Sequence, residues 1–227
     1  MKAMVLETPN TAYRMRDLPL PSIGDHEVLV KIRACGLCGT DLKVISGEVD
    51  TRGFPRIAGH EPMGTVAAKG AKVTNLEIGD RVVATVYSTC GACKHCRQGR
   101  TTLCRHARGR VGIDLDGGFG EYMKIAAANL VKVPDELTDE EAAILPCGVA
   151  VPYHALKVRA GLGPEDTVLV LGVGGVGIHG VQMARLLGAE VFAVDIDDEK
   201  LNIAREYGAS RVIKYDPERF KADLAEL

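Results

Sequence analysis

The segment TVLVLGVGGVG, residues 167–177, decides the fold of the second part of the chain. Its first five residues form a short apolar run that predicts a buried β-strand. Gly172, Gly174 and Gly177 follow at once. The first allows a tight turn, the second lets the backbone approach a pyrophosphate, and the third lets a helix pack closely. The segment therefore predicts a strand, a turn and a helix whose amino end binds a dinucleotide.

The residues that follow alternate between helical and strand patterns. A helical period runs from Val176 to Leu187, an apolar strand from Val191 to Val194, a helix from Glu199 to Tyr207 and a strand from Arg211 to Lys214. Strands joined in this way form a parallel sheet with crossover helices. A doubly wound dinucleotide fold has two such halves, and this chain supplies one, so we expect half of that fold.

An acidic residue at the end of the second of these strands indicates which nicotinamide cofactor is preferred. The Asp195 carboxylate can accept hydrogen bonds from the adenosine ribose hydroxyls, and Asp197 and Asp198 add negative charge where a 2′-phosphate would lie. NAD is therefore favoured over NADP. The expected cofactor-binding residues are Gly172, Gly174, Gly175, Val176, Gly177 and Asp195. A glycine-rich turn beside an unrelated acid is the alternative interpretation.

The first part of the chain, up to about Ala128, has a different pattern. Short alternating or β-branched runs at residues 27–32, 64–68 and 81–87 are separated by Gly and Pro turns. These runs predict a β-rich domain. The pattern changes near Asp135, where Thr138 and Glu141 form a capping-box signal that predicts the start of a helix carrying Cys147.

Four of the seven cysteines are crowded into one loop. Without a secretion signal a disulfide framework is not expected, and thiolates spaced by two residues can turn their sulfurs toward one point. A fourth sulfur from the end of the same loop completes a tetrahedron around Zn²⁺. The predicted structural zinc ligands are Cys90, Cys93, Cys96 and Cys104. Four reduced structural cysteines are the alternative.

Basic residues crowd the same loop, and no Asp or Glu lies between Cys90 and Arg110. Four thiolates around Zn²⁺ leave a net negative charge that these cations would offset. A nucleic-acid patch is the rival interpretation, but the loop has no aromatic residue to stack on bases and the rest of the chain is not basic. The basic residues are Lys94, Arg97, Arg100, Arg105, Arg108 and Arg110.

Composition excludes several classes of protein. The 227 residues hold 28 Lys plus Arg and 30 Asp plus Glu, a net charge of −2, and 46% are hydrophobic. This is the balance of a globular protein with a core. No apolar run reaches the roughly 18 residues that a membrane helix needs, and no signal-type stretch follows Met1. We expect a cytoplasmic protein with no membrane or nucleic-acid partner.

Three dispersed motifs complete the pattern: CGTD at residues 38–41, GHEPMG at 59–64 and PCG at 146–148. In this order, with the four-cysteine loop between them, they resemble the zinc-dependent medium-chain dehydrogenase/reductase family of the alcohol dehydrogenase type. The resemblance implies an α/β protein with a β-rich part. It has a GroES-like catalytic domain over residues 1–152 and the first half of a Rossmann NAD-binding domain over residues 153–227.

The resemblance also implies a second, catalytic zinc ion. Its ligands would be Cys38, His60 and Cys147, with Glu61 close enough to approach the metal or tune its field. Thr40 would pass the substrate proton toward solvent. The family usually continues this relay to a histidine three residues later, where this chain has Lys43 instead, so the relay is altered.

Two further residues have roles on this interpretation. Asp41 is placed to orient a zinc ligand by accepting the free N–H of His60, although such an acid alone is more often a helix cap. Cys35 forms a Cys-x-x-Cys with Cys38 but is no ligand in the family, and we expect it to be structural.

The expected function is reversible hydride transfer between a primary or secondary alcohol and NAD, with two zinc ions per chain. A polyol or sugar dehydrogenase of the same family is the alternative, although such members commonly carry Glu at the position of Cys147. A second alternative is a non-catalytic module that binds zinc and a nucleotide. Because family members are longer, we expect this chain to be a fragment of a protein that acts as a homo-oligomer on a small alcohol or carbonyl substrate.

Overall fold

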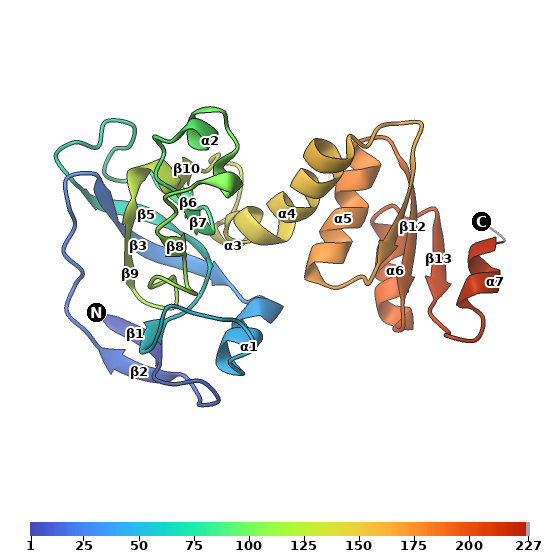
Figure 1. Cartoon of the computed structure of the whole chain (residues 1–227), viewed down its shortest axis with the longest axis horizontal. Coiled ribbons are helices and arrows are strands. Elements are labelled where there is room, and N and C mark those ends of the chain that lie inside the picture. Colours follow the sequence, from blue (N-terminus) through green and yellow to red (C-terminus); the bar gives the residue numbers. More distant parts are fainter. Residues whose placement is uncertain (226–227) are drawn as a thin grey trace. The chain divides into compact units, whose positions relative to one another are not determined.

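The computed structural model of the chain describes residues 1–225 and divides the chain into two compact units, Met1–Cys147 and Gly148–Leu227 (Figure 1). The domain boundary expected from the sequence, after residue 152, stays a prediction about the two domains. The expected second domain ends at residue 227, so its last two residues lie outside the described part.

A five-stranded antiparallel sheet forms the body of the first unit. Its strand order is β10-β6-β5-β3-β9. The strands are β3 (Glu27–Gly36), β5 (Glu61–Lys69), β6 (Arg81–Ala84), β9 (Tyr122–Ala126) and β10 (Leu130–Lys132). The expected strands at residues 27–32 and 64–68 are confirmed inside β3 and β5, and the two pair with Val30 opposite Val66.

The expected strand at residues 81–87 is corrected, because the structure breaks it in two. β6 ends at Ala84, and β7 (Tyr87–Ser88) pairs with β8 (Gly109–Arg110) in a separate small sheet. Between them the Thr85 N–H donates to the Asn129 carbonyl at 2.9 Å. The chain therefore leaves the large sheet here and carries the four-cysteine loop away from it.

Buried β-branched residues fill one face of the large sheet. Val28, Val30 and Val66 are at most 2% exposed and pack with Val82 and Leu76. Val28 and Val30 alternate along β3, as a strand with one buried face requires. Burying each such side chain contributes about 1.5–3 kcal/mol. This core anchors the strand ends that bear the site.

Smaller elements complete the first unit. A three-stranded sheet has the order β2-β1-β4. The remaining elements are β1 (Lys2–Leu6), β2 (Arg14–Asp17), β4 (Arg56–Ile57), the helices α1 (Gly39–Ile45), α2 (Lys94–Arg97) and α3 (Asp139–Ala143), the 3₁₀ turns η1 (Thr101–Leu103) and η2 (Ala127–Asn129), and the π-helix η3 (Leu145–Val149), which ends in the second unit. The expected capping box is confirmed at α3, where Thr138 and Glu141 bond each other's backbone.

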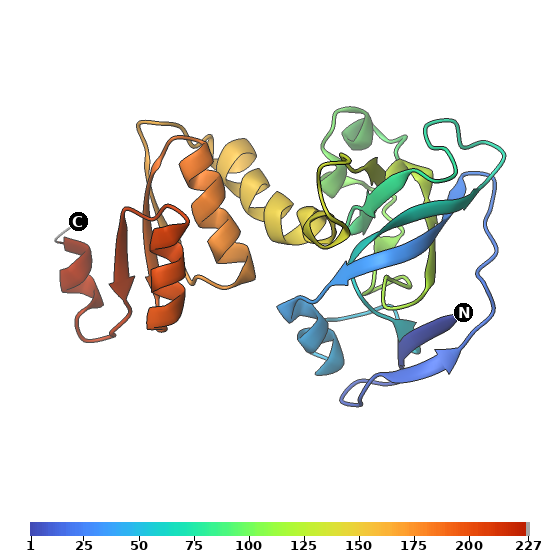
Figure 2. The same ribbon diagram turned by 180° about the vertical axis from the view of Figure 1, so that it is seen from behind.

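The second unit is a parallel sheet with crossover helices, as the sequence predicts (Figure 2). Its elements are α4 (Ala150–Tyr153), the π-helix η4 (His154–Ala160), β11 (Thr167–Leu171), α5 (Gly175–Leu186), β12 (Glu190–Asp195), α6 (Asp198–Glu206), β13 (Arg211–Lys214) and α7 (Phe220–Ala225). The order is β11-β12-β13. Helix α5 packs on β11 and β12, and α6 packs on β12 and β13, over a core that includes Val181 and Ala204.

The α/β class with a β-rich part is thus confirmed, and each expected element of the second unit lies within one residue of its expected bounds. Within residues 1–225 no helix is both long enough and apolar enough to cross a bilayer.

A glycine in the large sheet gives a test of this packing. A Cβ at Gly64 would overlap the Lys31 carbonyl oxygen and lie 2.7 Å from Val30 Cγ1, both in the neighbouring strand β3. We expect Gly64→Ala to destabilise the chain by about 1–3 kcal/mol, because a central strand cannot move aside. At Gly24 the nearest atom, Glu27 Oε2, lies at an ordinary 3.5 Å. Thermal unfolding by circular dichroism should show a lower Tm for Gly64→Ala than for Gly24→Ala, and equal values would contradict this packing.

Candidate functional site

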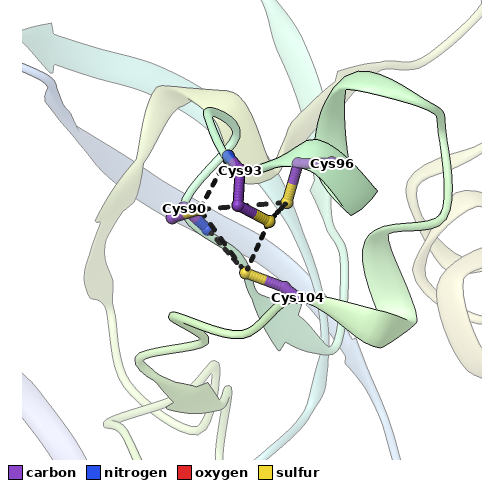
Figure 3. A group of neighbouring side chains, drawn as sticks. All are labelled: Cys90, Cys93, Cys96 and Cys104. Atoms are coloured by element: carbon purple, nitrogen blue, oxygen red, sulfur yellow. Dashed lines mark hydrogen bonds between the residues drawn. The ribbon is translucent and has the colours of Figure 1, made fainter.

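Four cysteine sulfurs meet in the loop that follows β7. Cys93 caps the short helix α2, Cys96 lies within it, and Cys104 follows η1. Figure 3 shows the side chains of Cys90, Cys93, Cys96 and Cys104 turned toward one another. The Sγ atoms of Cys90 and Cys104, and of Cys93 and Cys96, are 3.5 Å apart, while the Cys90–Cys96 and Cys93–Cys104 distances are 4.0 Å.

These distances can be compared with a metal site. Zinc–sulfur bonds of about 2.3 Å in a regular tetrahedron put the sulfurs about 3.8 Å apart. The observed values of 3.5 and 4.0 Å lie on either side of that figure. The donor set and spacing of this four-cysteine cluster therefore fit a structural Zn²⁺ ion.

Backbone N–H groups point at these sulfurs. The Cys93 N–H donates to Cys90 Sγ and the Cys90 N–H to Cys104 Sγ, both at 3.4 Å. The backbone N–H of Cys96 is the largest cause that lowers the pKa of Cys93, to about 6, and the N–H of Cys90 lowers the pKa of Cys104. Desolvation raises the pKa of Cys96 to about 12. The loop thus favours the thiolate form at two of its four sulfurs before any cation binds.

The basic residues around this cluster divide into two groups. Arg110 pairs with Asp114 at 2.8 Å, and Arg108 pairs with Glu27 at 3.5 Å. Among residues 1–225, the other four form no ion pair within 4.0 Å and stand exposed around the loop. They are Lys94, Arg97, Arg100 and Arg105. That their charge offsets thiolates stays a prediction.

A second group of potential ligands gathers at the beginnings of α1 and β5 and within η3. One ligand atom from each of Cys38, His60, Glu61 and Cys147 lies within 4.8 Å of the others. His60 and Glu61 are 2% and 4% exposed. We refer to this group as the mixed cluster. All four residues that the sequence analysis assigned to the catalytic metal are brought together.

Local backbone features deliver these side chains. Cys38 is the N-cap of α1, with extended backbone, and Glu61 opens β5. Cys147 lies in the π-helix η3, not in the regular α-helix that the sequence pattern indicates. Single π turns inside helical segments are frequent at functional sites, because the wider turn displaces a side chain from the regular helical position.

Asp41 holds two of these segments together. Its Oδ2 accepts the backbone N–H of Cys38 at 2.9 Å, and its Oδ1 lies 3.1 Å from His60 Nδ1. Both roles weighed for Asp41 in the sequence are therefore present, the helix cap and the histidine partner. With Nδ1 facing Asp41, His60 Nε2 faces the mixed cluster, 3.9 Å from Glu61 Oε1.

The electrostatics of the mixed cluster favour a cation. Desolvation lowers the pKa of His60, but hydrogen bonds with Asp41 and Cys147 more than offset it and raise the pKa to about 11. The pKa of Cys147 is raised: its hydrogen bond with His60 lowers it, but burial and the charges of Glu61 and Cys38 act more strongly together. A buried site that holds a proton so firmly is one in which positive charge is stabilised, and two sulfurs with one imidazole fit Zn²⁺.

Thr40 and Lys43 lie on α1 beside this cluster. The Thr40 hydroxyl is 3.8 Å from Cys38 Sγ, and the side chain is half-buried. Lys43 is exposed, and within the described residues its ammonium forms no ion pair within 4.0 Å. The hydroxyl is thus next to a ligand, while Lys43 reaches solvent.

The glycine turn of the second unit adopts the geometry that its sequence predicts. Gly172 has φ +85°, and a Cβ at Gly177 would collide with the Gly172 carbonyl oxygen. A Cβ at Gly174 or Gly175 would meet nothing within 4 Å. These two positions therefore leave open space at the amino end of α5, as a pyrophosphate needs. Val176 is 43% exposed in the same turn.

Asp195 contacts this turn directly. Its Oδ2 accepts the backbone N–H of Val173 at 2.7 Å and its Oδ1 that of Asp197 at 3.1 Å. The Val173 N–H is the largest cause that lowers the pKa of Asp195. The carboxylate thus fixes the glycine turn. Val173 was missed in the sequence because its contribution is a backbone group, which no side-chain pattern reports.

Other supporting residues were missed as well. A Cβ at Gly36 would collide with Glu61 Oε2, so glycine is required where β3 passes the mixed cluster. Gly59 has φ +90°, and a Cβ there would lie 2.5 Å from Phe119 and 2.9 Å from Cys35 Sγ. The sequence signal that could have indicated Gly59 is its position immediately before His60. The packing of Cys35 agrees with the structural role expected for it.

Comparison with known proteins follows the same division of the chain. Residues 24–135 match the family model for the alcohol dehydrogenase GroES-like domain. Residues 175–227 match the one for zinc-binding dehydrogenases.

Relatives with similar sequences cover nearly the whole chain. It is 42% identical over 215 residues to an alcohol dehydrogenase of Geobacillus stearothermophilus, a match that covers 94% of this chain and 63% of that protein. It is 39% identical over 228 residues to acryloyl-coenzyme A reductase of Metallosphaera sedula, with 99% and 68% covered. The chain thus spans about two thirds of the length of these relatives.

Comparison with solved structures leads to the same family as comparison of sequences. Acetophenone reductase from Geotrichum candidum, solved in complex with NAD, has a TM-score of 0.88 and 34% identity, with 94% of this chain and 63% of that chain covered. With both parts matched, and with relatives of this identity along its length, the chain belongs to the zinc-dependent medium-chain dehydrogenase/reductase family.

Proposed function

We propose that this chain carries the metal site and the adenosine half of the NAD site of an oxidoreductase that transfers a hydride between a primary or secondary alcohol and NAD. The observation that carries the proposal is the mixed cluster, in which two thiols, an imidazole and a carboxyl converge within 4.8 Å. Three protein ligands with room for one more are typical of catalytic zinc, whereas four cysteines are typical of structural zinc.

Cys38, His60 and Cys147 would hold the catalytic ion, with Glu61 beside it as a fourth or exchanging ligand. The four-cysteine cluster would hold the structural ion. When bound, the catalytic zinc supplies Lewis acidity that polarises an alcohol or carbonyl oxygen, and NAD supplies the hydride acceptor. The protein's own residues position these two groups and handle the proton.

The proton would leave through Thr40, whose hydroxyl lies 3.8 Å from the Cys38 sulfur. A hydroxyl can accept the substrate proton and donate its own to solvent in one relay step. We propose no acid–base step for exposed Lys43, whose flexible cation is suited to a ribose or phosphate of the cofactor. Asp41 would hold His60 with Nδ1–H bonded and Nε2 free to bind metal.

The cofactor would bind at Gly172, Gly174, Gly175, Val176 and Gly177, with its pyrophosphate at the amino end of α5. The open space at Gly174 and Gly175 supports this placement. Asp195 would accept the ribose hydroxyls through lone pairs that Val173 and Asp197 leave free. A buried carboxylate there would repel the 2′-phosphate of NADP, so NAD is proposed.

Substrate class, assembly and location are also proposals. Similar proteins include an alcohol dehydrogenase and an acryloyl-coenzyme A reductase. Cys147 favours a simple alcohol over a polyol as substrate. The GroES-like domain would span residues 1–152 and the dinucleotide-binding domain residues 153–227. We propose a cytoplasmic homo-oligomer that acts on small molecules.

An NADH absorbance assay of the full-length gene product on simple alcohols tests the activity, and bound zinc without turnover would favour the non-catalytic alternative.

Metal content tests the two sites separately. We expect about two zinc ions per chain, falling to about one in Cys104→Ser and to about one in His60→Ala, because each variant removes a ligand from only one cluster. Cys104→Ser should also lower the Tm, since neither α2 nor η1 in this loop contains a buried residue. Mass spectrometry of the metals gives the counts. Cys35→Ser is the control, and should keep two.

Removal of the Asp41 charge tests the histidine partner. Asp41→Asn should weaken metal binding at the mixed cluster by about 10- to 100-fold, because an amide cannot stabilise the bonded imidazole in the same way. Competition with a chromophoric chelator measures the affinity. The exposed carboxylate of Asp135 offers a control, Asp135→Asn, for which no change is expected. Equal affinities in the two variants would contradict the role of Asp41.

The preference between NAD and NADP tests the proposed role of Asp195. The wild-type chain should bind NAD more tightly than NADP, and Asp195→Asn should reduce the ratio of the two affinities by about tenfold or more, since one charge near the 2′-phosphate is removed. Isothermal titration calorimetry with both cofactors measures this ratio, again with Asp135→Asn as control. An unchanged ratio would show that Asp195 serves the glycine turn alone.

A further inference from the structure

A buried asparagine lies beside the segment that leads into the four-cysteine loop. Asn129 is 1% exposed and ends the 3₁₀ turn η2. Ala127 in the same turn and Leu130 after it belong to the apolar core of the large sheet, which anchors the turn. The proposed function gives Asn129 no role, yet a buried amide is costly unless its two N–H groups and its oxygen find partners.

The side chain of Asn129 bonds three consecutive residues. Its Nδ2 donates to the Tyr87 carbonyl and to Thr89 Oγ1, both at 3.1 Å, and its Oδ1 accepts the Ser88 hydroxyl at 3.4 Å. A carbonyl oxygen can only accept, so the atom that faces Tyr87 is the amide nitrogen. Ser88 and Thr89 are 2% and 7% exposed. Because these bonds lie out of contact with bulk water, their loss would leave buried groups unsatisfied.

The backbone of Asn129 extends this attachment toward the start of the segment. Its carbonyl accepts the Thr85 N–H at 2.9 Å and the Thr85 hydroxyl at 3.3 Å. Residues 85–89 are therefore bonded at both ends to one anchored residue. Cys90, the first ligand of the four-cysteine cluster, follows immediately.

Both arms of the four-cysteine loop meet at this segment. On the outgoing arm, a Cβ at Gly91 would lie 3.5 Å from the Ala128 side chain in η2. On the returning arm, the Arg108 N–H donates to the Ser88 carbonyl at 2.8 Å, beside the pairing of β7 with β8. The loop between them cannot be ordered by burial of its helices, because neither α2 nor η1 contains a buried residue.

Cys90 joins the anchored segment to the other sulfurs. Its N–H donates to Cys104 Sγ and its Sγ accepts the Cys93 N–H, both at 3.4 Å. Cys90 directly follows Thr89, whose hydroxyl accepts from the Asn129 amide. A shift of the backbone at Thr89 would therefore displace Cys90 from both of these cysteines.

We propose that Asn129 is a positioning residue of the four-cysteine cluster: its amide fixes the backbone of residues 87–89 and so holds Cys90 where its sulfur meets the other three. A metal ion that binds a preorganised loop loses less of its binding free energy to ordering the chain, so Asn129 raises the affinity of this cluster. The inference rests on the proposed metal site at the four cysteines and extends it to a residue that contacts no sulfur.

Co²⁺ binding measures the effect at each cluster separately. The visible absorption that Cys104→Ser abolishes reports the four-cysteine cluster, and the absorption that His60→Ala abolishes reports the mixed cluster. We expect Asn129→Asp, which loses both N–H donors, to weaken Co²⁺ binding at the four-cysteine cluster by about 10- to 100-fold in chelator competition. Affinity at the mixed cluster should not change.

A pair of variants at Thr89 tests the same bond without altering the asparagine. Thr89→Val keeps the shape of the side chain and removes the hydroxyl, and we expect about a three- to tenfold loss of Co²⁺ affinity at the four-cysteine cluster. Thr89→Ser keeps the hydroxyl and should bind like the wild type. The matched control for the new charge is Asn75→Asp at an exposed position, for which no change is expected at either cluster.

A merely structural role for Asn129 predicts a different set of results. Asn129→Asp would then lower the Tm of the metal-free and the zinc-loaded chain equally and leave Co²⁺ affinity unchanged, which would overturn the proposal. Equal losses of affinity at both clusters, or equal affinities of Thr89→Val and Thr89→Ser, would do the same. Failure of the proposed metal site is distinct, because Cys104→Ser would then leave Co²⁺ binding and the visible spectrum unaltered.

Discussion

The Asp41 carboxylate is the constraint on which the site depends. One oxygen begins α1 by accepting the Cys38 N–H, and the other accepts from His60, which directly precedes β5. One side chain therefore fixes two ligands of the mixed cluster and the tautomer of the imidazole between them. Because Asp41 is buried, its charge needs these donors, and the donors in turn hold the ligands in place.

The surrounding packing serves this arrangement. Gly36 lets strand β3 approach the Glu61 side chain, and Gly59 lets the Phe119 ring approach the backbone just before His60. A Cβ at either position would collide. The core of β3 and β5 holds the strand ends from which Glu61 and its neighbours project. The π-helix at Cys147 brings in the last sulfur from the end of the first unit.

Much of the structure could be predicted from residue patterns. The spacing of Cys90, Cys93, Cys96 and Cys104 was sufficient for the four-cysteine cluster, because all its ligands lie in one loop. Period and glycine spacing were sufficient for the strand, turn and helix after Thr167. The ligands of the mixed cluster are distant in sequence, so their convergence was expected only through resemblance to a family.

The features that the sequence did not predict depend on tertiary contacts. The run at residues 81–87 has strand character throughout, yet Tyr87 leaves the large sheet and pairs with Arg110 in a separate one. The bond from Val173 to Asp195 involves a backbone group, and the packing of Tyr13 against the core of Leu6, Val44 and Ile113 joins segments with no shared motif. Local patterns carry no signal for contacts of this kind.

On our proposal this chain builds two zinc sites with different ligands. X-ray absorption spectroscopy of the zinc-loaded chain tests it most directly, because it reports the mean ligand set per zinc. A four-sulfur site together with a site of two sulfurs and two lighter atoms predicts an average of about three sulfurs and one nitrogen or oxygen per zinc. An average of four sulfurs, or a shell dominated by nitrogen and oxygen, would contradict the account.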